Sequence, residues 1–257
     1  MALMAACTSC NPPENDNSAK NTNANADSNN NQGPIAIATP PVEIAPSQPL
    51  DPNFKECNPY YPLIPGSQAR YSLLYSTGLQ ANAIIVVNQT TEAGVTMFEQ
   101  KMQIVDKSGG HNKNEIAVEK FVCDKGRIKA IAENRDNTVD QSRTLVELHY
   151  TDPAYTMLEP GALKQGATWS YSFTSTLQGS ETGTSKSDRS LTASCKVQGE
   201  EDVTVPAGKF KALKVIKNIG KSEITEYYAR GMGLVKRVAG DGTTWELMSY
   251  SGLRAGG

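Results

Sequence analysis

The residue types that could carry chemistry in this chain are its five cysteines and two histidines. Cys7 and Cys10 lie near the start, whereas Cys57, Cys123 and Cys195 are spread through the rest of the chain. A cysteine can carry a lipid, form a disulfide, bind a metal or act as a nucleophile, and its surroundings decide which. Position therefore divides the five into an N-terminal group and a group inside a folded domain.

The histidines lack the partners that metal binding or catalysis needs. His111 lies in a glycine-containing loop, and His149 follows Leu148 in a strand-like stretch. Neither has a second histidine or a cysteine at ligand spacing, so we expect both at the surface, with no metal and no cofactor. The acidic run from Glu200 to Asp202 lacks the alternating spacing of a calcium loop, which favours a solvated turn. No HExxH, GxSxG or P-loop pattern occurs, so we predict that the protein is not an enzyme.

The first seven residues, MALMAAC, resemble the end of a bacterial lipoprotein signal peptide, in which small residues precede a cysteine that receives lipid. Met4 stands where that pattern usually has leucine, and the positive region and most of the apolar region are missing. We expect a translation start further upstream, with residues 1–10 as the remnant of the signal and anchor and Cys7 as the lipid attachment site. The alternative is an N-terminus that only happens to contain a cysteine.

Residues 11–56 are predicted to form a disordered linker. The stretch 11–32 contains nine asparagines and no aliphatic residue larger than alanine, so it cannot bury enough apolar surface to offset its ordering entropy. Prolines between positions 34 and 52 stiffen the remainder. Asparagine-rich tracts can instead aggregate, but the scattered charges and prolines argue against this. Such a linker would hold a folded domain clear of a membrane.

The overall composition excludes two classes of protein. The formal net charge of −2 and a pI near 5.8 give no basic field for nucleic acid. No apolar run approaches the roughly 18 residues that a membrane-spanning helix needs. The expected partners are therefore a membrane reached through the lipid anchor, and a lipid or an envelope protein.

Short β-rich runs alternate with turn signals from Ala69 onward, and no stretch has the period of a long amphipathic helix. Only Glu115–Glu119 and Asp152–Leu158 could hold a short helical turn. The cleanest strand is Thr168–Leu177, where Trp169, Tyr171, Phe173 and Leu177 alternate with serines and threonines. We expect twelve strands, at Ala69–Thr77, Asn82–Thr91, Gly94–Lys107, Asn114–Cys123, Arg127–Glu133, Arg143–Thr151, Thr168–Leu177, Ser187–Gln198, Lys209–Ile219, Ser222–Arg230, Gly233–Ala239 and Thr243–Ser251.

The stretch Val203–Val238 reads as three strands joined by tight turns. Within it, Val205–Phe210 (VPAGKF) predicts a corner, because proline ends a strand and the glycine permits a reversal. The sequence around Gly233 resembles the sequence around Gly126. Both glycines stand where a hairpin turn needs a residue with φ > 0. A second sequence similarity relates the stretch that begins at Gly66 to the stretch that begins at Gly166. These repeats favour two related meanders, although chance similarity among β-rich segments is the alternative.

Three pairings are open to the cysteines of the folded domain in an oxidising compartment. Alternating strand directions bring Cys57, Cys123 and Cys195 toward one end of the sheet. We prefer a Cys57–Cys123 disulfide, since it ties the exit of the linker to the first meander. Cys195 is predicted to be a buried free thiol.

Three motifs occur in an order that resembles a group of uncharacterised bacterial envelope lipoproteins. They are Tyr61–Gly66 (YPLIPG), the Val205–Phe210 corner and Tyr227–Lys236 (YYARGMGLVK), and the resemblance covers roughly Tyr60 to Tyr250. That group is similar in architecture to the carriers and receptors of lipoprotein sorting, which are open antiparallel half-barrels that hold acyl chains. This chain departs from them because it lacks the helices that line their cavity. The resemblance implies an envelope location and a curved β sheet, and names no substrate.

The fold class that we predict is all-β: a curved antiparallel sheet or open β-barrel of about eleven to twelve strands. It occupies residues 57–252, with meanders at about 57–151 and 152–252 and a tail at 253–257. Whether the sheet closes is not decided by the sequence.

We expect a non-catalytic, lipid-anchored protein of the bacterial cell envelope, at the outer membrane facing the periplasm or at the cell surface. Its concave β surface would bind a hydrophobic ligand or an envelope protein. The candidate lining is Trp169, Tyr171, Phe173, Trp245 and Leu247, which would simply be core if the sheet closes. The alternative is a structural or surface-display lipoprotein that acts through protein–protein contacts.

Overall fold

The computed structural model describes residues 55–106, 113–139, 142–179 and 186–253. Cys7, the linker up to residue 54, His111 and the last four residues lie outside the described residues, so the predictions made for them stay predictions. Within the described residues, no helix is long and apolar enough to cross a membrane.

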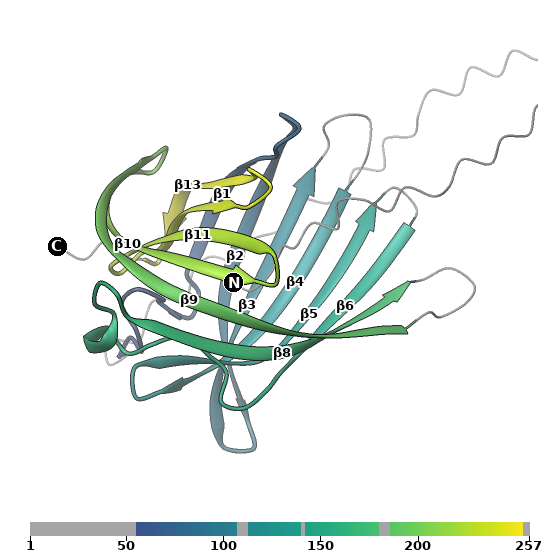
Figure 1. Ribbon diagram of the computed structural model, residues 1–257, viewed down its shortest axis with the longest axis horizontal. Coiled ribbons are helices and arrows are strands. Elements are labelled where there is room, and N and C mark those ends of the chain that lie inside the picture. Colours follow the sequence, from purple (N-terminus) through teal and green to yellow (C-terminus); the bar gives the residue numbers. More distant parts are fainter. Residues whose placement is uncertain (1–54, 107–112, 140–141, 180–185, 254–257) are drawn as a thin grey trace, which may run out of the picture. The chain divides into compact units, whose positions relative to one another are not determined.

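Thirteen strands and one short 3-10 helix, η2 (Pro160–Ala162), make up the regular structure of the described residues. Figure 1 shows the long strands wrapping around a common interior. The strands are β1 (Gln68–Leu74), β2 (Gln80–Glu92), β3 (Val95–Asp106), β4 (Lys113–Asp124), β5 (Arg127–Val139), β6 (Ser142–Tyr150), β7 (Tyr155–Met157), β8 (Thr168–Gly179), β9 (Lys186–Val205), β10 (Gly208–Ile219), β11 (Ser222–Ala229), β12 (Gly233–Ala239) and β13 (Thr244–Ser251).

The sheet closes on itself. Its strand order is β4-β3-β2-β1-β13-β12-β11-β10-β9-β8-β6-β5-β7, and β4 also pairs with β5, which joins twelve strands into a ring. The thirteenth, β7, pairs with Ile128 and Lys129 of β5, just before the part of β5 that pairs with β6. The pairings are antiparallel throughout. The all-β antiparallel class is therefore confirmed, and closure distinguishes the barrel from the open half-barrel that the resemblance implied.

Each of the twelve strands expected from the sequence is present, and three local expectations were wrong. Asp152–Leu158 contains strand β7 and not a helical turn, because Ile128 and Lys129 of β5 offer it a pairing edge. Glu115–Glu119 lies inside β4. Glu200–Asp202 is not a turn, because β9 continues past a bulge opposite Lys214 and pairs with β10 as far as Val205.

The reversals depend on the residues that the sequence singled out. Gly126 and Gly233 have φ of 85° and 75°, a region that side chains rarely enter, so each turn is built on a glycine. A Cβ on Gly233 would also lie 3.0 Å from Cδ of Pro62. Pro206 and Ala207 form the corner between β9 and β10, and the backbone amide of Ala207 donates to the carbonyl of Leu247 at 2.9 Å.

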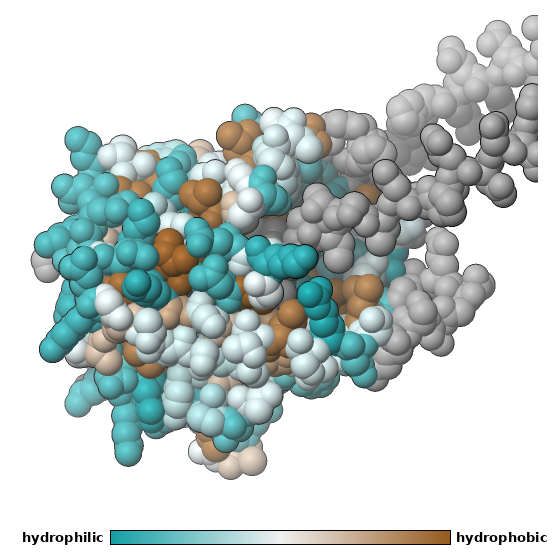
Figure 2. Space-filling view, viewed as in Figure 1, coloured by the Kyte–Doolittle hydropathy of each residue, from teal (hydrophilic) through white to brown (hydrophobic). Residues whose placement is uncertain are grey.

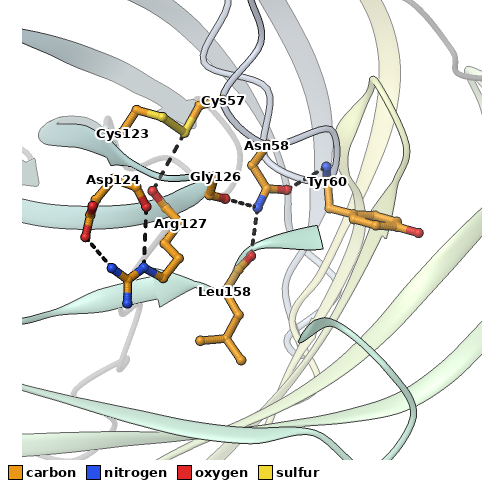
Figure 3. Close-up of a disulfide and its surroundings, with 8 residues drawn as sticks. All are labelled: Cys57, Asn58, Tyr60, Cys123, Asp124, Gly126, Arg127 and Leu158. Atoms are coloured by element: carbon orange, nitrogen blue, oxygen red, sulfur yellow. Dashed lines mark hydrogen bonds and ion pairs between the residues drawn. A yellow bond between two sulfur atoms is a disulfide. The ribbon is translucent and has the colours of Figure 1, made fainter. Parts of the chain in front are cut away.

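The segment before β1 is fastened at one end of the barrel. A disulfide joins Cys57 to Cys123, with a Cα–Cα distance of 5.9 Å, which is the pairing preferred from the sequence (Figure 3). The buried Asn58 side chain follows it and donates to the carbonyls of Gly126 and Leu158, at 2.8 Å each. The amide of Tyr60 in turn donates to the Asn58 side-chain oxygen at 2.9 Å. These bonds position the segment so that Tyr61 enters the core.

Candidate functional site in the barrel interior

The predicted lining residues come together inside the barrel. Phe173, Trp245 and Leu247 are at most 1% exposed, Tyr171 is 3% exposed, and all belong to one apolar core. Trp169 is half-buried and packs against that core. Because the sheet closes, these five residues fill the interior and do not form an open concave surface.

None of these five residues lines the small cavity that the barrel contains at one end. A cavity at one end of the barrel, lined by Tyr61, Tyr71, Ile85, Met232 and their neighbours, holds about 40 Å³. That volume accommodates about one water molecule, whereas sites for small molecules are typically larger than about 300 Å³. This cavity therefore cannot hold an acyl chain.

The interior also contains a buried ion-pair cluster built by β10, β11 and β12. Lys217 Nζ lies 2.7 Å from Glu226 Oε2, and the Tyr228 hydroxyl donates to the same oxygen at 2.8 Å. Arg237 Nε lies 3.8 Å from Glu226 Oε1, and its guanidinium is 5.9 Å from the ring centre of Trp245. The three charged side chains are at most 3% exposed.

Electrostatics hold this cluster ionised. Burial pushes the pKa of Glu226 upward, but the charges of Lys217 and Arg237 outweigh burial and lower the pKa to about 2. Burial likewise pushes the pKa of Lys217 down, and the charge of Glu226 outweighs it, so that the pKa lies above its usual value. Glu226 is therefore a permanent anion between two cations at neutral pH.

A second cluster lies on β4, β5 and β6. Glu133 is fully buried and pairs with Arg135, while its second oxygen accepts a hydrogen bond from the Tyr150 hydroxyl at 3.1 Å. Arg135 Nη1 also lies 3.8 Å from Glu115 Oε1. Glu119 faces Glu133 directly across the β4–β5 pair. This cluster thus places two buried carboxylates side by side.

The environment of Glu133 has the opposite effect from that of Glu226. Burial raises the pKa of Glu133 to about 7, Arg135 opposes the rise and the neighbouring Glu119 adds to it. Glu133 can therefore hold a proton under mildly acidic conditions.

Buried tyrosines lie between the two clusters. The Tyr61 hydroxyl donates to Gln100 Oε1 at 3.1 Å, and burial together with Glu119 and Glu226 keeps its pKa well above the usual value. The Tyr171 hydroxyl is buried and makes no hydrogen bond to the described residues. Burial raises its pKa as well, while Lys217 works against this rise. The interior is thus aromatic and charged at once.

Sequence reasoning missed the charged members of both clusters, although a signal was present. Glu226 occupies the same face of β11 as Ile224 and Tyr228, which are both buried. Lys217 lies in the same way between Val215 and Ile219 of β10. A charged residue that replaces an apolar one in the period-2 pattern marks a buried ion pair, since unpaired charges are rarely buried.

The remaining candidates lie where they contribute little. His149 is 67% exposed, and its Nε2 lies 3.6 Å from Glu147 on the outer wall. Cys195 is the buried free thiol of the described residues, and burial raises its pKa to about 12. The described residues contain no cluster of histidine, cysteine or acidic side chains suited to a metal. The face shown in Figure 2 is mostly hydrophilic or neutral, with small separate apolar groups.

Comparison with known proteins gives no family. No protein-family model matches the chain, and no curated protein matches it. The chain is similar to a solved structure from Bacteroides fragilis, described as a protein inferred to be exported with a YmcC-like fold, at 14% identity and a TM-score of 0.43. That match covers 76% of this chain and all of the other. A structure from Parabacteroides distasonis, inferred to be a lipoprotein, is 12% identical with a TM-score of 0.40 over 77% of this chain and all of the other. Likenesses this distant carry no functional argument.

Proposed function

We propose that this protein is a non-catalytic, lipid-anchored protein of the bacterial cell envelope, and that its barrel acts through contacts between its outer wall and other envelope proteins. The observation that carries this proposal is the filled interior. Tyr171, Phe173, Trp245 and Leu247 are buried core residues, and a separate cavity lined by Tyr61, Tyr71 and Met232 holds about 40 Å³.

The disulfide supports the envelope location. Structural disulfides persist in oxidising compartments and are rare in the cytosol. The Cys57–Cys123 bond lies where the chain leaves the predicted linker. Lipid attachment at Cys7 followed by a long polar tether would present the barrel at a distance from the membrane.

A hydrophobic ligand inside the barrel is the second candidate. The aromatic lining favours it, since ligand sites are rich in such side chains. It would require the packed side chains to move apart, which costs the contacts that they make with one another.

Native mass spectrometry of the barrel purified from its own envelope separates the two candidates. We expect the mass of the ligand-free chain, together with cross-links to envelope proteins that map to outward-facing residues of the wall. The proposal would be overturned in favour of internal ligand binding by a lipid that co-purifies stoichiometrically and no longer binds when the aromatic residues of the interior are substituted.

The anchor is tested independently by metabolic labelling with a palmitate analogue. The full-length gene product should carry the label and float with membranes, and Cys7→Ser should abolish both. A matched Cys10→Ser variant should keep both. Unlabelled full-length protein would show that the anchor assignment is wrong.

A further inference from the structure

The ring of strands is split along one seam. β12 pairs with β13 over Lys236–Val238 only. The first part of β12, Gly233–Val235, lies against β11 alone, and the last part of β13, Leu247–Ser251, pairs with β1 alone among the described strands. Two stretches of strand edge therefore lie on either side of the seam with no ladder of backbone hydrogen bonds between them, and such edges need a cover.

The residues beside this split are nevertheless buried. Val235 of β12 and Leu247 of β13 are both 0% exposed. The Tyr71 hydroxyl crosses the seam and donates to the carbonyl of Leu234 at 2.8 Å. The backbone amide of Ala207, from the corner between β9 and β10, donates to the carbonyl of Leu247 at 2.9 Å. Other parts of the chain therefore cover the split.

Most of this cover is a two-stranded arm, Glu200–Lys211, formed by the end of β9 and the start of β10. Glu200–Val205 pairs with β10 but not with β8, because the pairing of β9 with β8 ends at Lys196. Gly208–Lys211 does not pair with β11, because that pairing begins at Ala212. β9 contacts both β12 and β13, although β10 and β11 separate it from β12 in the sheet, and Figure 1 shows it curving around the barrel toward β13.

The arm is joined to the ring through a bend. The register of β9 and β10 shifts between Lys214 and Val215, and Gly199 on the opposite strand has φ of 134°, which favours glycine. A bulge of this kind bends the strand and increases its twist. Because neither β8 nor β11 pairs with the arm, the arm can rotate about this bend while every pairing of the ring stays intact.

The arm is held to the seam mainly by apolar burial. Val203 and Val205 are its buried residues, at 6% and 5% exposure, and both belong to the core. The Ala207 amide supplies the backbone hydrogen bond to β13, and the Tyr60 hydroxyl donates to Glu200 Oε1 at 3.1 Å near the base. A segment attached in this way opens more readily than strands joined by continuous ladders.

We propose that the arm is a latch over a side opening of the barrel, and that its release uncovers the split between β12 and β13. Release breaks the Ala207 hydrogen bond and exposes Val203 and Val205 on the arm. It uncovers Val235 and Leu247 on the seam, so the opening has an apolar rim. The closed and open states of the barrel differ by the position of the arm, and the ladders of the ring are the same in both.

Hydrogen exchange in wild type tests the release without any substitution. The Ala207 amide should exchange through local opening, at a rate that depends weakly on low urea concentrations, because release exposes little surface. The Val197 amide, on the ring side of the bulge, donates to the carbonyl of Ala167 at 2.9 Å and should follow the steep urea dependence of global unfolding. A dependence at Ala207 as steep as that at Val197 would show that the arm does not open by itself.

A thiol probe shows whether release uncovers the split. Val235→Cys places a thiol at a position with 0% exposure, in a protein that also carries Cys7→Ser, Cys10→Ser and Cys195→Ala. It should react with a polar maleimide at least about tenfold faster than Val197→Cys, the matched thiol at an equally buried position of the ring. Equal rates would contradict the latch, since both thiols would then wait for unfolding of the whole barrel.

Loosening the arm should speed this labelling. Val203→Ala/Val205→Ala removes buried methyl groups from the arm and should accelerate reaction at Val235→Cys by roughly tenfold or more. The matched control is Thr204→Ala, which alters the exposed residue between the two valines and should leave the rate unchanged. If the double substitution accelerated labelling at Val197→Cys by the same factor, it would have destabilised the whole barrel, and the latch would be rejected.

Discussion

A few buried charged side chains have a large effect on the stability of this barrel. Glu226 is fully buried and accepts from both Lys217 and Tyr228, and Arg237 lies on its other side. An ion pair of this kind gains little over an apolar pair of the same shape, but it becomes very costly when one partner is removed. The cluster should therefore be intolerant of single substitutions.

Lys217→Met tests this directly. It leaves Glu226 with Arg237 at 3.8 Å as its remaining cation, so we expect a loss of about 3–5 kcal/mol in the free energy of unfolding. The matched control is Lys214→Met on the same strand, whose partner Glu201 is 46% exposed and which should cost less than about 1 kcal/mol. If urea denaturation gave the same loss in the free energy of unfolding for both substitutions, the buried cluster would contribute no more to stability than the exposed ion pair.

Among the elements, the segment from Cys57 to Ser67 precedes the first strand, and only its last two residues, Gly66 and Ser67, exchange backbone hydrogen bonds with Val87 of β2. Its attachment depends on the disulfide, on the Asn58 side chain and on the burial of Tyr61 and Leu63. The closed ring of β1–β6 and β8–β13 does not need the segment for its own pairing. The disulfide therefore stabilises the element that covers one end of the core.

Reduction of the disulfide should lower the free energy of unfolding by about 4 kcal/mol. This is the contribution expected when a cross-link across 66 residues restricts the conformational entropy of the unfolded chain. The effect of reductant should vanish in Cys57→Ser/Cys123→Ser and persist in Cys195→Ala, because Cys195 forms no disulfide. Urea unfolding with and without dithiothreitol measures it. Reductant sensitivity that persisted in the double variant would place the cross-link elsewhere.

At the scale of the whole molecule, closure turns a potential binding surface into a core. Aromatic rings of neighbouring strands pack together on the inner face, such as Tyr71 with Trp245 at 6.1 Å, and Tyr61 joins rings of two strands that are not neighbours, Phe121 of β4 at 5.5 Å and Tyr228 of β11 at 6.2 Å. The interior is thus occupied by the protein's own side chains. Under the proposed function, recognition of other molecules falls to the outer wall and the turns.

Phe173→Ala measures whether the interior is core or ligand site. A packed core residue truncated to alanine should cost about 3–5 kcal/mol, because the cavity left behind collapses only partly. Leu177→Ala on the same strand is the control, since Leu177 is 43% exposed and should cost less than about 1 kcal/mol. A stable Phe173→Ala protein that loses a bound lipid would indicate a ligand site instead.

The exposure of Leu177 also shows where strand periodicity fails. The sequence placed it on the same buried face as Tyr171 and Phe173. In the structure it lies beyond Phe173, the last fully buried residue of β8, while the adjacent Thr176 is buried and donates to Asp188 at 2.7 Å. Periodicity assigns a face, but it does not say how far the core extends along a strand.

Local chemistry in the sequence determined the elements of this protein. Alternating residues marked twelve strands, glycines at positions 126 and 233 marked hairpins, and Pro206 marked a corner, because each depends on backbone conformations that neighbouring residues set. Cysteine placement also favoured the pair that the structure joins, since alternating strands bring Cys57 and Cys123 to one end.

Only the tertiary structure decided closure, and with it the character of the site. Whether β1 pairs with β13, or Glu119 stands opposite Glu133, depends on register between distant strands, which no local pattern encodes. The same long-range pairing makes Trp245 and Leu247 core residues and brings Lys217 and Arg237 to Glu226. The sequence therefore determined that the protein is built of strands, and closure determined that its interior is filled and charged.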